Sequence, residues 1–407
     1  MLETRGMKAV VTMLVVALGW APRVCAEAAL APGTESTVDV PQSGAQIKVF
    51  LPSNYQPTTK WPAVFFFPGT GGAASTALIR HYTDDRDFIV VGLPYVTPNT
   101  AQPLPDFVSR ELQNFRSARQ WLAAHASTDE ARVYLGGVSK GGWTTTQLGE
   151  PELPRLAGLI ILIAGRGYPF SQAPGGTAYR GKPVYIGDGE TDNNMRPARQ
   201  ATTFYQTRGA AVTFEEYPGI GHAMPDEAPR LRTWLLTQGR YQARAAAAQP
   251  ELATWFSNAV AAVRAAQDAG EKFRLVLDLV RDPRLWLCAP PAGATAQALL
   301  KEVTARSPAK EEWTAETTYW SLLWKSANLH TPDELRAARD GFLALSTTYP
   351  NLRWGRLAAE DYRFLADAYA RTMATRTTIT NNTVRPTDSN RGIPTPRWSG
   401  NKIIFDR

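Results

Sequence analysis

The sequence predicts an α/β fold, in which a mostly parallel β-sheet carries helices on both faces and is followed by a C-terminal all-α domain. Between residues 34 and 240, short and continuous apolar segments alternate with stretches of helical periodicity. This alternation is typical of a parallel sheet covered on both faces. From residue 241 onward the apolar segments stop and Ala-rich sequence with helical spacing begins. In such a sheet, functional residues are expected at the carboxyl ends of the strands.

The individual strands are predicted from apolar runs that end in turn residues. TESTVDV and AQIKVFLP lie on either side of PQSG, which is typical of a β-hairpin. Residues 106–126 have the spacing of an amphipathic helix. Further strands are expected at 62–69, 87–96, 132–139, 156–165, 183–189 and 211–218.

Length and composition exclude several classes of protein. The chain has 407 residues, of which 44% are hydrophobic and 20% charged, which excludes intrinsic disorder, collagen-like repeats and a polytopic membrane protein. The net charge is +7, but Lys and Arg are scattered, so we expect no nucleic-acid partner. Two cysteines exclude a disulfide framework and zinc motifs built on paired cysteines.

Residues 1–26 have the pattern of a secretory signal peptide, because a basic start, a short apolar run and small residues follow one another. The apolar run is too short to span a bilayer, although a membrane anchor is the alternative interpretation. We therefore expect export to the periplasm or the extracellular space, without stable membrane insertion after cleavage. Cleavage after Ala26 removes Cys25 and leaves Cys288, which we expect to be a buried small hydrophobic residue.

The segment Gly137-Val138-Ser139-Lys140-Gly141 has the spacing G-x-S-x-G. An apolar strand precedes it and the helix-compatible stretch GGWTTTQLGE follows it. The two glycines permit a sharp turn from strand to helix, which exposes the serine hydroxyl at the end of the sheet. An ordinary glycine-rich turn is the alternative. The context favours Ser139 as a nucleophile.

A serine nucleophile needs a base, and the base needs a carboxylate that orients it. His222 lies on a Gly-flanked turn directly after the last predicted strand, and Asp192 lies in the turn after the strand at 183–189. The order Ser, Asp, His is the one expected for a sheet of this kind. Asp188 is the rival for the acid, and Glu190 is a more distant third.

The oxyanion of an acyl-transfer reaction is held by backbone N–H groups. The turn Pro68-Gly69-Thr70-Gly71-Gly72 follows a buried strand, and its glycines allow the backbone to approach a substrate oxygen. We expect the donors to be the N–H groups of Thr70 and of Lys140, the residue after the nucleophile. A simple turn at 68–72 is the alternative. No metal and no organic cofactor is expected.

Residues from about 45 to 240 resemble an α/β-hydrolase, through the motifs FFFPGTGG, YLGGVSKGGW, YIGDGETD and YPGIGHAMP. Within that superfamily the chain is similar to secreted esterases grouped with polyhydroxybutyrate depolymerases, feruloyl esterases and predicted exported peptidases. The resemblance implies Ser139 as nucleophile, His222 as base and Asp192 as acid. In one departure, many relatives have His-Gly before the oxyanion turn, whereas Pro68 precedes Gly69 here.

Several large side chains near strand ends are candidates for contact with a substrate. Tyr95, Trp143 and Met224 are the main ones, and Tyr168 and Phe170 lie in a similar position. Each of them could equally belong to the core.

The second half of the chain shows helical patterns without visible chemistry. Trp313, Trp320 and Trp324 fall on one helical face, and a capping threonine begins a helix at Thr331 that ends before Pro350. Another helix is expected over 354–371. The predicted organisation is therefore a signal peptide at 1–26, a catalytic domain at 27–240, a helical domain at 241–375 and a loosely ordered tail at 376–407.

The function expected from the sequence is that of an exported serine hydrolase, which cleaves a small-molecule or polymeric carboxylic ester through an acyl-enzyme on Ser139. A serine peptidase with the same triad is one alternative. A secreted binding protein that uses its helical half to hold an unknown partner is another.

Overall fold

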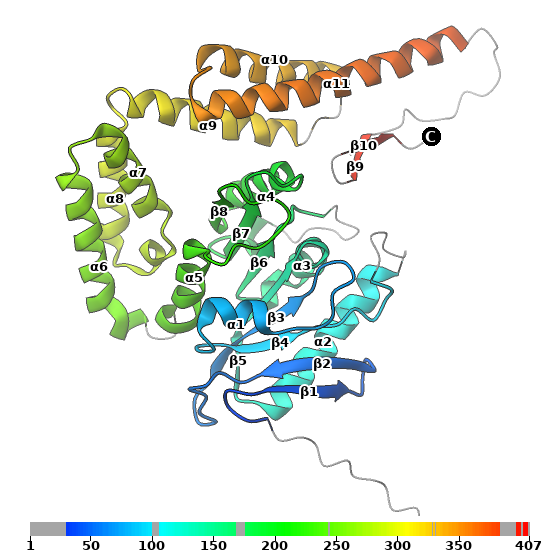
Figure 1. Cartoon of the computed structure of the whole chain (residues 1–407), viewed down its shortest axis with the longest axis vertical. Helices are drawn as coiled ribbons and strands as arrows, with labels where there is room; N and C mark the ends of the chain where they lie inside the picture. The colour runs from blue at the N-terminus through cyan, green and yellow to red at the C-terminus, as the bar shows by residue number, and fades with distance from the viewer. Residues whose placement is uncertain are drawn as a thin grey trace, which may run out of the picture.

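The computed structural model describes residues 30–99, 106–167, 176–242, 245–327, 329, 331–382, 396–399 and 402–405. The predicted signal segment 1–26 and the candidates Tyr168 and Phe170 lie outside the described residues. The first part of the chain is built on an eight-stranded sheet, and a helical region follows it (Figure 1). The predicted fold class is confirmed.

The sheet has the order β1-β2-β4-β3-β5-β6-β7-β8. The hairpin β1–β2 is antiparallel, β2 pairs antiparallel with β4, and all pairs from β4 to β8 are parallel. Parallel neighbours need crossovers, and the intervening helices supply them. The strands are β1 (Glu35–Val40), β2 (Ala45–Phe50), β3 (Trp61–Phe67), β4 (Ile89–Gly92), β5 (Thr128–Val138), β6 (Gly158–Leu162), β7 (Pro183–Gly189) and β8 (Ala211–Tyr217).

Helices cover both faces of this sheet. One apolar core joins the sheet to α2 (Phe107–His125), α3 (Lys140–Glu152) and α4 (Met195–Thr207). A second core, on the opposite face, joins it to α1 (Ala77–Thr83) and α5 (Pro229–Leu236). Strands β3 and β6 are buried along their whole length, which explains their continuous apolar sequences.

The helical region forms two apolar clusters. The first joins α6 (Ala245–Ala265), α7 (Ala269–Arg281) and α8 (Pro290–Val303). The second joins α9 (Ala309–Ser326), α10 (Pro332–Thr348) and α11 (Arg353–Asn382), and α10 starts with the expected capping box on Thr331 and Glu334. None of the described helices is long and apolar enough to cross a membrane.

The helical region lies along the β8 edge of the sheet, beside α4 and α5 (Figure 1). Trp320 of α9 packs edge-on against Phe214 of β8, with ring centroids 5.7 Å apart. Arg353 of α11 forms an ion pair with Glu216 of β8. An exposed edge strand can pair with another chain, and these contacts cover the edge here.

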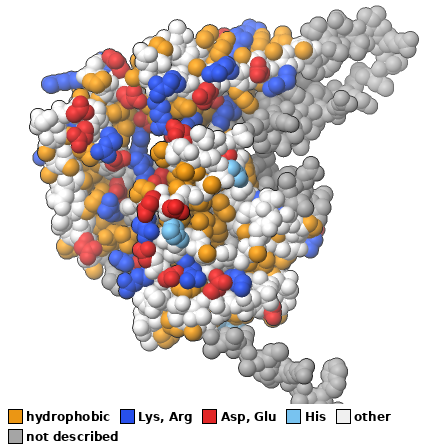
Figure 2. All heavy atoms as spheres, in the orientation of Figure 1, with side chains coloured by type: hydrophobic (Ala, Val, Ile, Leu, Met, Phe, Trp, Pro, Cys, Tyr) orange, Lys and Arg blue, Asp and Glu red, His pale blue; other side chains and the backbone are white. Residues whose placement is uncertain are grey.

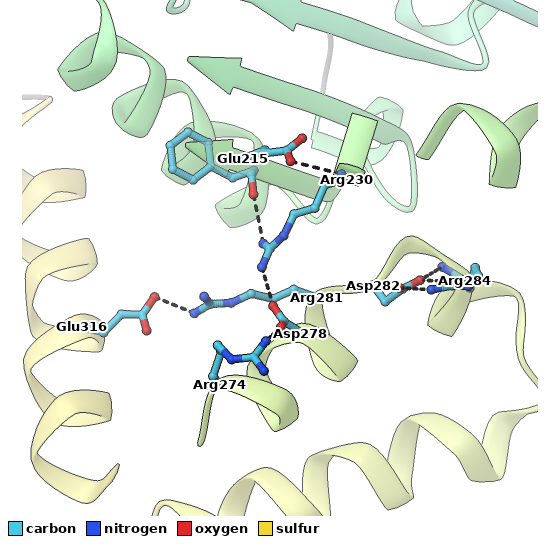
Figure 3. A network of polar contacts seen from close by, with 9 residues as sticks. Glu215, Arg230, Arg274, Asp278, Arg281, Asp282, Arg284 and Glu316 are labelled. Atoms are coloured by element: carbon cyan, nitrogen blue, oxygen red, sulfur yellow. Dashed lines mark hydrogen bonds and ion pairs between the residues drawn. The ribbon is translucent and has the colours of Figure 1, made fainter. Parts of the chain in front are cut away.

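Ion pairs reinforce this junction, as Figure 3 shows for the contacts around α7. Arg230 of α5 donates to Asp278 of α7 at 2.7 Å, and Arg281 of α7 pairs with Glu316 of α9. The carboxylate of Glu316 is almost fully buried and also accepts from the indole N–H of Trp320 at 3.2 Å.

A second group of polar contacts ties α4 to the helical region. Arg196 of α4 pairs with Asp361 of α11, which is 5% exposed. Tyr319 of α9 donates to the same carboxylate at 2.9 Å and lies 3.4 Å from an Nη atom of Arg199. Because α4 begins only three residues after Asp192, these contacts hold the helix that follows the candidate acid.

Some boundaries differ from the sequence prediction. Strand β4 ends at Gly92 rather than near residue 96, and α11 runs to Asn382 rather than to residue 371. Two short strands, β9 (Pro396–Ser399) and β10 (Lys402–Phe405), lie within the segment expected to be a loose tail.

Cys288 is only half-buried, because it follows a short turn at the surface of the helical region rather than a core helix. Trp313 and Trp320 pack against the two helical clusters.

The buried carboxylate of Asp361 gives a test of this junction. Asp361→Asn removes the charge that pairs with Arg196, and we expect it to lower the free energy of unfolding by about 2 kcal/mol. Asp84→Asn is the matched control, because Asp84 pairs with Arg232 while 72% exposed and is expected to cost less than about 0.5 kcal/mol. Urea unfolding measures both, and equal losses in the two variants would contradict the described junction.

Candidate active site

Ser139 lies at the turn from β5 to α3, where the backbone is forced into a sharp bend. Its φ is 55°, in the left-handed region, and its N–H donates to the carbonyl of Leu162 at 2.8 Å. A Cβ built on Gly137 would lie 2.3 Å from the carbonyl carbon of Gly141, and a Cβ on Gly141 would lie 2.2 Å from the oxygen of Phe67. Both contacts are with backbone, so only glycine fits at either position.

The structure brings Ser139, His222 and Asp192 together, although they come from three different strand ends. The Oγ of Ser139 lies 2.8 Å from Nε2 of His222, and Nδ1 of His222 lies 2.7 Å from Oδ2 of Asp192. A neutral imidazole satisfies both contacts when Nδ1 carries the proton, which leaves Nε2 free to accept from the serine hydroxyl. It is Asp192, rather than its rival Asp188, that contacts His222.

The loops that carry the acid and the base are held against each other by hydrogen bonds. The N–H of Glu190 donates to the carbonyl of Tyr217 at 3.0 Å, and the carboxylate of Glu190 accepts from the N–H of Gly219 at 2.9 Å. The N–H and the hydroxyl of Thr191 both donate to Ile220, each at 3.0 Å. Glu190 therefore joins the two loops and does not contact the imidazole in the described interactions.

Two asparagines support the site, and sequence reasoning missed both. The N–H of Asn194 donates to Oδ1 of Asp192 at 3.0 Å, and its side-chain amide donates to the carbonyl of Ile163 at 3.0 Å. The amide of Asn99 donates to the carbonyls of Gly69 and Gly72 at 3.1 and 3.0 Å. An aspartate in a turn commonly accepts the backbone N–H two residues further on, so the sequence does signal the contact between Asn194 and Asp192. Nothing in the sequence signals the contacts of Asn99.

The Gly-rich turn after β3 lies beside the nucleophile. A Cβ built on Gly69 would lie 3.5 Å from Cβ of Ser139 and 4.0 Å from its Oγ. The turn is closed by a hydrogen bond from the N–H of Gly72 to the carbonyl of Gly69, at 3.1 Å, and Thr70 lies within it. Lys140 is the first residue of α3, and N–H groups in the first turn of a helix have no acceptor inside the helix.

Tyr95 supports this turn from behind. Its hydroxyl donates to the carbonyl of Pro68 at 3.0 Å, and its ring stacks on Phe67 with centroids 5.4 Å apart. Burial raises the pKa of Tyr95 well above its ordinary value, so the hydroxyl stays a neutral donor. The ammonium of Lys140 lies 4.4 Å from the centre of the same ring, and partial burial lowers the pKa of Lys140.

The imidazole of the candidate site is exposed to solvent, whereas the carboxylate behind it is buried. The side chain of His222 is 52% exposed, whereas that of Asp192 is 2% exposed. Trp143 on α3 and Met224 in the loop after His222 are both half-buried against the cores. Figure 2 shows acidic and basic side chains interspersed over the face that it draws.

Comparisons with known proteins found no matching family model and no matching curated protein. Solved structures do resemble part of the chain. A phospholipase/carboxylesterase from Dyadobacter fermentans is 18% identical, with 48% of this chain and 93% of that chain covered and a TM-score of 0.35. A CE1 ferulic acid esterase from Anaeromyces mucronatus is 14% identical, covering 51% of this chain and 87% of that one, with a TM-score of 0.36. A thermostable esterase from Pseudomonas putida is 18% identical, covering 51% and 80%, with a TM-score of 0.40. The description of this chain therefore rests on its own sheet order and on the geometry of its own candidate site.

The close backbone contact at Gly141 is testable. Gly141→Ala places a methyl group against the backbone of β3, and we expect it to destabilise the protein by about 1–3 kcal/mol through overpacking. Gly293→Ala is the matched control, because a Cβ on Gly293 in helix α8 meets open space and is expected to stabilise by up to about 1 kcal/mol. Thermal unfolding of both variants checks this. A Gly141→Ala protein as stable as the wild type would show that the bend is not packed as described.

Proposed function

We propose that the chain is an exported serine hydrolase that cleaves carboxylic esters through an acyl-enzyme on Ser139. The observation that carries this proposal is the pair of short contacts that runs from Ser139 through His222 to Asp192. A serine hydroxyl is a weak nucleophile until a base takes its proton, and the base works best when a carboxylate fixes its tautomer and orientation.

In the first half of the proposed reaction, Oγ of Ser139 attacks the ester carbonyl carbon while Nε2 of His222 takes the hydroxyl proton. The resulting imidazolium is stabilised by Asp192, which is almost fully buried and therefore acts through a little-screened contact. The tetrahedral intermediate then collapses. The bond to the alcohol breaks, and His222 returns its proton to the departing oxygen.

In the second half, water replaces the alcohol. His222 takes a proton from the water as its oxygen attacks the acyl carbon, and the bond to Oγ of Ser139 then breaks. The proton returns to Oγ, which restores the enzyme and releases the carboxylic acid. Each negative oxygen formed on the way is held by the N–H groups of Lys140 and Thr70, and one such donor typically contributes a factor of about 10²–10³ in rate.

The substrate class that fits this site is an ester with a bulky or polymeric part. The exposed imidazole and half-buried Ser139 leave the reacting centre accessible, rather than at the bottom of a deep cavity. Trp143 and Met224 offer apolar surface for the acyl or alcohol part. Tyr95 is assigned to the support of the oxyanion turn, since its hydroxyl is engaged with Pro68.

The assignment of an exported location, periplasmic or extracellular, is supported by the sequence pattern of residues 1–26. The proposal includes no nucleic-acid partner, because the basic residues are scattered along the chain.

A panel of esters tests the proposal. Purified protein is assayed with acyl groups of increasing length and with aromatic esters. Ser139→Ala is expected to lower kcat/KM at least about 10³-fold, because it removes the nucleophile but leaves the oxyanion donors. Ser346→Ala is the matched control, since Ser346 lies on the exposed side of α10 and is expected to keep full activity.

The same assay separates esterase from peptidase activity. For each acyl group, the ester is compared with the amide that has the same leaving-group skeleton. Faster cleavage of the amides would identify a peptidase. Hydrolysis that is equally fast in the wild type and Ser139→Ala would contradict the proposed mechanism altogether.

A further inference from the structure

A second aspartate lies behind the candidate acid. Asp188 is the penultimate residue of β7 and is fully buried, with no exposed surface. Its carboxyl group lies in hydrogen-bonding contact with the carboxyl group of Asp192, whose side chain is also almost fully buried. The site therefore contains two adjacent buried carboxyl groups, of which only one contacts His222.

The hydrogen bonds around these two groups require a proton between them. Oδ1 of Asp188 accepts the N–H of Gly189 at 2.8 Å, but its Oδ2 is buried without a donor. Asp192 has donors on both oxygens, Nδ1 of His222 on one and the N–H of Asn194 on the other. Carboxylates only accept hydrogen bonds, so a contact between the two groups is favourable only when one carries a proton.

That proton belongs on Asp188. Asp192 already accepts one hydrogen bond on each oxygen, whereas Asp188 accepts a single one, from a backbone N–H. The other groups that face Asp188 are Arg199 of α4, which is already paired with Glu216, and Tyr217 of β8. Burial and the neighbouring Asp192 raise the pKa of Asp188 to about 9, so it is a neutral acid at neutral pH.

We propose that Asp188 is a positioning residue, whose neutral carboxylic acid donates its O–H to the Asp192 carboxylate and thereby holds Asp192 in line with His222. This inference rests on the proposed function, in which Asp192 orients the base. A neutral donor holds the Asp192 carboxylate in one direction without placing a second negative charge beside it. When Asp188 loses its proton, two buried negative charges face each other and the alignment is lost.

Two substitutions distinguish the hydrogen bond that Asp188 donates from the loss of its proton at high pH. Asp188→Asn keeps a donor of the same shape that cannot titrate, whereas Asp188→Ala removes the donor. We expect the wild type to lose kcat above about pH 9, and we expect Asp188→Asn to retain most of its activity at neutral pH without that alkaline fall. We expect Asp188→Ala to lower kcat about 10- to 100-fold, by analogy with the loss of a group that orients a ligand at a metal site. Asp226→Asn, an exposed carboxylate after His222, is the control and should leave the pH profile unchanged.

Two further readouts do not depend on ester hydrolysis. Because the native state retains a proton that the unfolded chain loses, the wild type should lose stability relative to Asp188→Asn as pH rises from 3.8 towards about 9. The infrared spectrum of the wild type at neutral pH should contain the carbonyl band of a protonated carboxyl group, which shifts on carbon-13 labelling of aspartate. That measurement needs no variant, so absence of the band would overturn the inference even if both substitutions prevent folding.

An unprotonated Asp188, seen as absence of the labelled band, would overturn the inference. So would an Asp188→Asn variant with the same alkaline fall as the wild type, or an Asp188→Ala variant with unchanged kcat. Failure of the proposed function is recognised separately, because it leaves Ser139→Ala as active as the wild type while the infrared and stability readouts still report on Asp188.

Discussion

The candidate site depends on one close approach of backbones, at the point where α3 begins against the ends of β3 and β5. Gly137, Gly141 and Phe67 contact one another without intervening side chains, and this contact leaves Ser139 in the left-handed region of φ. The same bend places the first amide of α3 and the Gly69 turn beside the serine oxygen. The proposed nucleophile and the proposed oxyanion donors are therefore positioned by backbone packing, which is the condition for efficient electrostatic stabilisation.

The acid and the base reach Ser139 from loops that the rest of the molecule holds in place. Glu190 and Thr191 join the loop that carries Asp192 to the loop that carries His222. The neutral Asp188 proposed above supports Asp192 through the contact between their carboxyl groups. The helix that follows the acid loop is α4, and Arg196 in its first turn pairs with the buried Asp361 of α11. In this account the helical region contributes to the site indirectly, because it covers the β8 edge and anchors the helix behind the acid.

The sequence alone predicted the features that depend on residues close together in the chain. Apolar runs predicted the strands, and the spacing around Ser139 predicted a bend that only glycine permits. The sequence favoured Asp192 as the acid but left Asp188 as its rival, because both lie at the end of the same strand. The three-dimensional path of the loop is what brings Asp192 into contact with His222. Asn99 and Asp361 escaped prediction for a related reason, since their partners lie 27 to 165 residues away and polar residues carry no periodic signal for such pairs. The length of α11 was underestimated because its last turns are rich in threonine, which has a low helix propensity.

Covalent labelling tests the central claim, that Ser139 is the activated nucleophile. The protein is incubated with a fluorophosphonate, and its intact mass and its labelled peptide are measured. The account predicts a single adduct on Ser139 in the wild type, none in Ser139→Ala, and slow labelling in His222→Ala, because the hydroxyl then lacks its base. Equal labelling of the wild type and Ser139→Ala, or an adduct mapped to another residue, would contradict it.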